Sequence, residues 1–151
     1  MGCFVCAKHR DGEPMPGGPV GSDDLVVVSH VSPDAPGQNG APVYLGHLVV
    51  EPRRHAPGLA DLTDDEAAAV GLWLARSGRA LRAAGAEHVY STVVGHAVDH
   101  LHVHLVPRYP GTPREYWWPR LDDWPDAPLG DVDEAARVVR DLRAHLEGSG
   151  G

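Results

Sequence analysis

The sequence is poor in three features that would each indicate a particular class of protein. It has only two cysteines, its 13 Lys and Arg residues are outnumbered by 21 Asp and Glu residues, and no apolar run approaches the roughly 18 residues of a membrane span. The net charge of -8 argues against a general nucleic-acid binder, which would usually carry a basic stripe. The N-terminus also lacks the apolar segment of a secretory signal. We therefore expect a cytoplasmic protein that binds neither nucleic acid nor a membrane.

Length and hydrophobic content are those of a folded domain. The 151 residues are enough for one core, and a hydrophobic fraction of 42% is ordinary for a globular chain. No internal repeat and no linker divides the sequence. We therefore predict a single domain over residues 1–151.

Apolar periodicity and turn residues predict an α+β fold with an antiparallel sheet. The segment from Thr63 to Glu66 is a capping box, which opens a helix that should run to about Ala84. Two strands are expected before this helix and two after it, and only residues 96–99 separate the last two, as in a hairpin. The expected strands are 25–31, 43–51, 88–95 and 100–106, the loops are 7–24 and 32–42, and the C-terminal helix is 131–147.

Residues 107–130 form a segment rich in proline and tryptophan. They hold six of the 14 prolines, together with Trp117, Trp118 and Trp124. Tryptophan tends to be buried, so we expect an ordered, irregular arm and not a disordered tail. Covering the core is the favoured role for these rings, and a stacking platform for a nucleobase is the alternative.

Three histidines alternate with apolar residues in the segment 100–106, which reads His-Leu-His-Val-His-Leu-Val. Alternation at period two is typical of a half-buried strand, on which the three imidazoles would share one face. Imidazole suits nucleophilic attack, proton transfer or metal ligation near neutral pH. The pattern indicates a chemical site, although a chance cluster among ten histidines or the polar face of an edge strand would give a similar sequence.

This segment resembles the signature of the histidine triad (HIT) family, His-φ-His-φ-His-φ-φ with φ apolar. Residues 46–55, Gly-His-Leu-Val-Val-Glu-Pro-Arg-Arg-His, are similar to the family's Gly-His-x-Leu-Val-x-Pro-x-x-His, and residues 3–6 look like the Cys-x-x-Cys of its zinc-containing bacterial branch. The resemblance covers residues 3 to about 109. It implies a HIT-like fold with an antiparallel sheet of about five strands, one long central helix and a C-terminal helix.

The resemblance also implies catalytic roles. In the family, the middle histidine attacks the α-phosphorus of a nucleotide or nucleotide conjugate, and the covalent nucleotidyl-imidazole is then released to water or another acceptor. His102 is accordingly the expected nucleophile. His104, as a second catalytic residue, and His47 would hydrogen-bond the phosphate oxygens or the leaving group.

The same resemblance implies a structural zinc ion held by Cys3, Cys6, His55 and His100, because a Cys₂His₂ set forms a closed tetrahedral shell. A redox Cys-x-x-Cys and a pair of inert thiols are the alternatives. A thioredoxin-like motif expects a preceding strand, whereas only two residues precede Cys3.

Two substrate-binding positions depart from the family pattern. In the family's nucleotide-binding members, an acidic residue in an Asp-φ-x-Pro segment holds the ribose hydroxyls. The corresponding residues 30–33 of this sequence read His-Val-Ser-Pro. The glutamine that contacts phosphate is replaced by His96, and the hydroxyl beside it is lost at Ala97. His30 and His96 are thus candidates for substrate contact, with a structural role as the alternative for each. The other histidines, His9, His88 and His145, are expected at the surface.

We predict a zinc-containing HIT phosphohydrolase or nucleotidyl transferase that acts on a small phosphorylated or nucleotide-conjugate metabolite. One alternative is a HIT-fold enzyme with altered chemistry, such as a lyase or group transfer in specialised metabolism. A non-catalytic nucleotide-binding protein is the other. A homodimer is expected only by analogy with small relatives of this fold.

Overall fold

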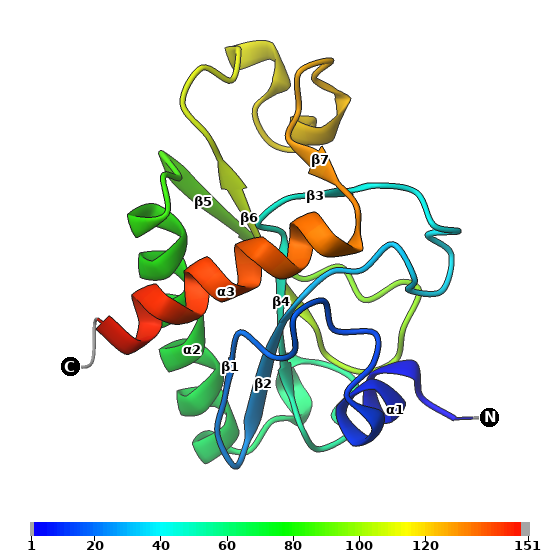
Figure 1. The fold of residues 1–151 in the computed structure, drawn as a ribbon. Helices are drawn as coiled ribbons and strands as arrows, with labels where there is room; N and C mark the ends of the chain where they lie inside the picture. The colour runs from blue at the N-terminus through cyan, green and yellow to red at the C-terminus, as the bar shows by residue number, and fades with distance from the viewer. Residues whose placement is uncertain (1, 149–151) are drawn as a thin grey trace.

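The computed structural model describes residues 2–148, so Met1 and residues 149–151 of the predicted domain lie outside the described residues. Its main sheet is antiparallel and five-stranded, in the order β1-β2-β4-β6-β5, and the long helices α2 and α3 pack on one face of it (Figure 1). These strands are β1 (Gly21–Ser22), β2 (Val26–His30), β4 (Leu48–Pro52), β5 (His88–Thr92) and β6 (Val103–Arg108). The predicted α+β architecture is confirmed.

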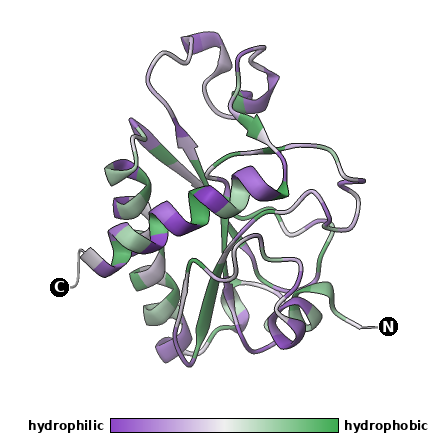
Figure 2. Ribbon diagram, viewed as in Figure 1, coloured by the Kyte–Doolittle hydropathy of each residue, from purple (hydrophilic) through white to green (hydrophobic). Residues whose placement is uncertain are grey.

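Helix α2 (Asp64–Ala83) begins at the predicted capping box. The Thr63 hydroxyl accepts a hydrogen bond from the Glu66 backbone N–H at 3.1 Å, and the Glu66 carboxylate accepts one from the Thr63 N–H at 2.8 Å. Helix α3 (Val132–Gly148) lies across the same face of the sheet, and Figure 2 shows apolar and polar segments alternating along it. Both helices cover a core formed by alternate strand residues, namely Val26, Val28, Leu48, Val50, Val103 and Leu105.

The opposite face of the sheet carries the polar side chains. Ser29, Glu51 and His104 alternate with those core residues, so they point away from α2. Helix α1 (Phe4–Asp11) covers part of this face, where Lys8 is 5% exposed and donates to the Ser29 hydroxyl. The candidate site therefore lies on the side of the sheet that the long helices leave open.

The strand predicted over residues 43–51 is two strands in the structure. Gly46 has a φ of +94°, which breaks the extended backbone between β3 (Val43–Tyr44) and β4. β3 leaves the main sheet and pairs with β7 (Leu129–Gly130) in a separate two-stranded sheet. The break directs the chain just before His47.

Two predicted boundaries also shift. Residues 7–11 belong to α1, not to the predicted loop, because the Cys3 Sγ atom caps this helix by accepting from the Cys6 backbone N–H at 3.4 Å. β5 and β6 pair antiparallel as predicted, but residues 93–102 connect them in place of a four-residue hairpin loop. His100 and His102 consequently precede β6, and of the three triad histidines only His104 lies on it.

The Pro/Trp-rich segment folds after β6 and contains β7 and two short 3₁₀ helices, η2 (Arg114–Tyr116) and η3 (Leu121–Asp123). A further 3₁₀ helix, η1 (Leu59–Asp61), precedes α2. Within residues 2–148, none of the helices combines the length and the apolar character needed to cross a membrane.

Candidate active site and metal site

His47, His102 and His104 come together on the open face of the sheet. The His47 Nε2 atom lies 2.9 Å from the His104 Nδ1 atom, and the His102 and His104 ring centroids are 5.0 Å apart. His47 enters this group from the turn before β4, and His104 from the neighbouring strand β6. The two motifs that were singled out in the sequence therefore form one cluster.

Burial keeps the paired imidazoles neutral. Burial, with the nearby His104 and His30, lowers the pKa of His47 to about 3. Burial and the neighbouring His102 lower the pKa of His104 as well. At neutral pH the pair can therefore donate and accept hydrogen bonds without a net positive charge.

The backbone fixes the orientation and tautomer of His102. Its Nδ1 atom lies 2.8 Å from the His100 carbonyl oxygen, which can only accept, so Nδ1 carries the proton. In the neutral ring, the lone pair is then on Nε2. A neutral imidazole held in this way is suited to nucleophilic attack.

His30 lines a pocket together with His102, but both of its ring nitrogens bond to backbone groups, and its predicted substrate contact stays a prediction. Its side chain is 1% exposed, its Nε2 accepts from the Gly46 N–H at 2.8 Å, and its Nδ1 donates to the Val31 carbonyl at 2.7 Å. These bonds leave no ring nitrogen for a ribose hydroxyl. His30 instead supports the turn that leads into His47.

His96 lies on the loop between β5 and β6 and is exposed. It follows Gly95, whose φ of +74° turns the chain. The structure does not bring His96 into the group formed by His47, His102 and His104. Its predicted phosphate contact stays a prediction.

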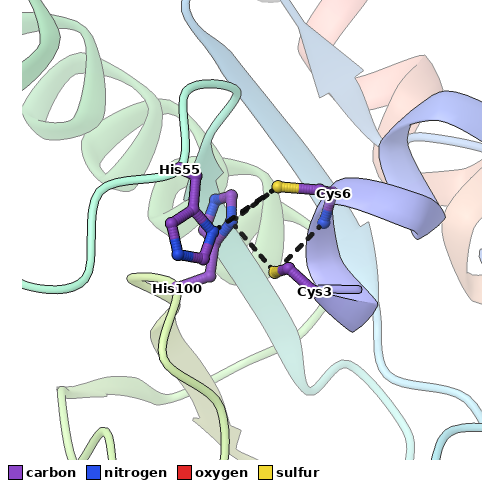
Figure 3. A group of neighbouring side chains, drawn as sticks. All are labelled: Cys3, Cys6, His55 and His100. Carbon is purple, nitrogen blue, oxygen red and sulfur yellow. Dashed lines mark hydrogen bonds between the residues drawn. The ribbon is translucent and has the colours of Figure 1, made fainter. Parts of the chain in front are cut away.

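Four side chains converge beside the N-terminal helix, as Figure 3 shows. The His100 Nδ1 atom lies 3.5 Å from both cysteine sulfurs, and the His55 Nδ1 atom lies 3.6 Å from the Cys6 sulfur. All four potential ligand atoms, from Cys3, Cys6, His55 and His100, lie within 4.8 Å of one another. In a tetrahedral zinc site, ordinary zinc–sulfur and zinc–nitrogen bond lengths separate S and N by about 3.6 Å.

The hydrogen bonding of His100 also fits a metal ligand. Its Nε2 atom lies 2.8 Å from the Pro52 carbonyl oxygen and must be the donor, so the lone pair on Nδ1 faces the two sulfurs. A ligating histidine usually donates its other N–H to such an acceptor. The donor set and its geometry therefore fit a structural zinc ion and leave no coordination position open.

A buried ionic cluster was missed in the sequence. The Glu51 carboxylate, 2% exposed, accepts from the Lys8 ammonium at 2.8 Å and from His9 Nε2 at 3.0 Å. Burial opposes ionisation of Glu51, but the hydrogen bonds from His9 and Lys8 hold its pKa below the ordinary value. The side chain of His9, a residue predicted at the surface, is thus only 7% exposed and paired with Glu51. A single acid inside an apolar strand was the signal that could have pointed to this cluster.

Two pockets flank the histidine group. One, of about 100 Å³, is lined by His102 together with Lys8, Glu51 and residues of α1 and the β2–β3 connection. The other, of about 220 Å³, lies on the β5–β6 side and includes His47, His104 and Trp118. His102 and the His47–His104 pair therefore adjoin space that small molecules can enter.

Comparisons with known proteins agree with this geometry. A family model described as the HIT domain matches residues 20–111. A curated relative from Mycobacterium tuberculosis, named AP-4-A phosphorylase, is 34% identical over 77 residues, which are 46% of this chain and 40% of the relative. The matched region thus spans less than half the length of that relative.

Solved structures show the same fold along nearly the whole chain. A Zn-bound histidine triad family protein from Mycobacterium smegmatis has a TM-score of 0.71 and 22% identity, over 99% of this chain and 98% of that one. A hypothetical histidine triad nucleotide-binding protein from Sulfolobus tokodaii has a TM-score of 0.72 and 19% identity, over 97% and 93% of the two chains. The Cys₂His₂ cluster and the Zn-bound neighbour together support the predicted structural zinc. Because the HIT-domain model spans more than half of the chain and includes both histidine motifs, the chain belongs to the histidine triad family.

Proposed function

We propose that the chain is a phosphohydrolase or nucleotidyl transferase whose nucleophile is His102. The observation that carries this proposal is the bond from His102 Nδ1–H to the His100 carbonyl, which leaves Nε2 to carry the lone pair of the neutral ring on a residue that lines a pocket. His100 is unsuited to the same role because its lone pair faces the two cysteine sulfurs. The substrate is a small phosphorylated metabolite or a nucleotide conjugate.

The reaction proceeds by two displacements at phosphorus. In the first, the His102 Nε2 lone pair forms a bond to phosphorus, and the bond from phosphorus to the leaving group breaks. The leaving group keeps that electron pair and takes up a proton from solvent. In the second, a water oxygen bonds to phosphorus, the N–P bond breaks, the imidazole regains its lone pair and the water releases a proton. An acceptor hydroxyl in place of water gives transfer.

His104 and His47 assist by hydrogen bonding. Their rings share one hydrogen bond and lie next to His102, so an N–H of this pair can donate to an oxygen that gains charge as phosphorus is attacked. Removing one such donor typically slows an enzyme by roughly 10²–10³. Zinc bound by the four Cys and His side chains would hold α1 against the segment before β6, and its closed shell would leave the displacement to the histidines.

The name of the curated relative supports a nucleotide-related substrate, and the HIT family match supports the same class. The residue at the ribose-binding position indicates that the preference among nucleotide substrates has changed. His30 replaces the expected acid and has both ring nitrogens bonded to backbone groups, so it cannot hold two ribose hydroxyls. We therefore expect a preference for substrates without a free cis-diol.

Two alternatives follow from the altered substrate contacts. A HIT-fold lyase or group-transfer enzyme would use the same histidines on another bond, and a nucleotide-binding protein would not turn over its ligand. The backbone hydrogen bond that fixes the His102 ring through Nδ1 favours catalysis over simple binding. A homodimer, a cytoplasmic location and the lack of a nucleic-acid partner stay predictions.

The test compares the native protein with His102→Ala and His104→Ala on a panel of nucleoside phosphoramidates, dinucleoside polyphosphates and phosphate esters. His102→Ala should lose all turnover and the covalent phosphoryl or nucleotidyl adduct seen by mass spectrometry after acid-free quenching. His104→Ala should retain the adduct and turn over about 10²–10³ times more slowly. An adduct on another residue, or full activity of His102→Ala, would contradict the proposal.

A further inference from the structure

The 220 Å³ pocket on the β5–β6 side is built by the Pro/Trp-rich arm. The arm supplies Trp118, Pro119, Leu121 and Asp122 to its wall. The rest of the lining comes from the sheet and its connections, namely Tyr44, Thr92, Val94, Val106 and the His47–His104 pair. The pocket therefore adjoins the reacting histidines on the side opposite the one that His102 shares with α1.

Trp118 lines this pocket and packs against Tyr90. Its side chain is 43% exposed, yet its ring is held against Tyr90, with the ring centroids 5.8 Å apart. The neighbouring Trp117 is used differently, because its ring lies 3.6 Å from the Arg108 guanidinium and its N–H donates to the Thr112 carbonyl. One tryptophan thus packs within the fold while the next one faces open space.

The other walls are apolar surfaces. The Tyr44 hydroxyl already donates to the Pro107 carbonyl at 2.7 Å, so this residue offers mainly its ring. Thr92 and Asp122 are the polar groups apart from the histidines. A cavity of roughly 150 Å³ is large enough to hold benzene. A pocket of about 220 Å³ therefore accommodates one aromatic ring with its substituents.

We propose that this pocket is the subsite for the substrate's leaving group and that it selects a planar aromatic ring, which stacks on Trp118. This inference rests on the proposed function, because the group that departs when the His102–phosphorus bond forms must lie away from the attacking nitrogen. The departing group keeps the electron pair of its bond to phosphorus and takes up a proton from solvent. An aromatic contact of this kind changes affinity by about tenfold.

The test uses two 2′,3′-dideoxyadenosine 5′-phosphoramidates, which share a nucleotide half without a free cis-diol. One carries benzylamine and the other cyclohexylmethylamine, so only the planarity of the leaving ring differs. The measured quantity is the ratio of their kcat/KM values, compared between variants so that intrinsic reactivity cancels. Trp118→Ala should lower the ratio about tenfold, because only cleavage of the benzylamine compound becomes slower. Trp118→Phe should keep a ratio close to that of the native protein, because it retains an aromatic ring. Trp124→Ala, which removes a tryptophan of the same arm that does not line this pocket, should leave the ratio unchanged.

Failure of the subsite and failure of the proposed function give different results. An unchanged ratio in Trp118→Ala, with turnover that still needs His102, overturns the subsite and leaves the function intact. If the native protein cleaves neither compound, the subsite is tested by the binding of the two free amines. Their affinities are measured by NMR titration of the Thr92 and Val106 amide signals. Tighter binding of benzylamine that is lost about tenfold in Trp118→Ala supports the subsite. Equal binding of both amines, or no change in the variant, overturns it.

Discussion

The Nε2 atom of His47 and the Nδ1 atom of His104 lie 2.9 Å apart and share a single hydrogen bond. One residue comes from the turn before β4 and the other from β6, so the bond ties together two motifs 57 residues apart. Only one of the two facing nitrogens can carry a proton without repulsion. The bond needs at least one neutral imidazole, and burial favours the neutral form of both rings.

This arrangement predicts a pH dependence of stability. Burial and His104 lower the pKa of His47 from 6.5 to about 3, so the unfolded chain binds this proton more readily than the folded chain. The contribution of neutral His47 to the free energy of unfolding is complete above about pH 6.5 and is lost as the pH falls toward 3. Between pH 6.5 and 5.5, urea denaturation should show the native protein losing about 1 kcal/mol more than His47→Gln. Equal losses would contradict this, and the exposed His88→Gln is the control.

The metal cluster predicts a loss of both zinc and stability in Cys6→Ser. The native chain should contain one zinc by elemental analysis, because its donor set matches a closed tetrahedral shell. Cys6→Ser should lose most of the metal and at least about 3 kcal/mol of stability, or roughly 10 °C in Tm, since structural zinc binding is coupled to folding. His88→Gln should keep both. The site would not be a zinc site if the native protein contained no metal, carried a Cys3–Cys6 disulfide and did not gain stability when zinc was added.

Because Lys8 and Glu51 form a buried ion pair, removing one partner should greatly lower the free energy of unfolding. Glu51→Ala leaves the Lys8 ammonium, 5% exposed, without its counter-charge and should lower the free energy of unfolding by about 3–5 kcal/mol. The double variant Lys8→Met/Glu51→Leu should cost less, because no unpaired charge remains. Asp123→Ala breaks an exposed ion pair with Arg120 and should change stability by less than about 1 kcal/mol. A double variant as unstable as Glu51→Ala would contradict the charge argument.

Alanine substitutions at two glycines should have opposite effects on the stability of the protein. Gly46 has a φ of +94°, and a Cβ there would meet the Tyr109 hydroxyl and lie 2.7 Å from Pro107 Cγ. Gly46→Ala should therefore cost more than about 2 kcal/mol and reduce activity by moving the adjacent His47. Gly71→Ala, on the open side of α2 with nothing near its Cβ, should stabilise the protein by about 0.5–1 kcal/mol. Thermal denaturation of both variants checks the pair, and similar effects from the two would refute the argument.

Much of the fold was predictable because its signals are local. The capping box at Thr63 and Glu66 acts between residues three apart, and it places the start of α2 correctly. The valines of β2 favour a strand, and the alternation of histidine with apolar residues leading into β6 indicates another, because adjacent side chains of a strand point to opposite faces. Where a local pattern was continuous but the backbone was not, the prediction failed. Residues 43–51 read as one strand, and only the left-handed conformation at Gly46 divides them.

The sequence by itself determined which side chains were available for chemistry, because the histidine motifs, their spacing and the paired cysteines are properties of neighbouring residues. Only the tertiary structure decided what each side chain does. His100 directs Nδ1 at the cysteine sulfurs because its Nε2–H donates to the Pro52 carbonyl of β4. His30 supports a turn because its Nε2 accepts from the Gly46 N–H. Trp118 faces a pocket through its packing on Tyr90. The role of a side chain depends on which distant groups satisfy its hydrogen bonds and cover its surface, and those contacts exist only once the chain is folded.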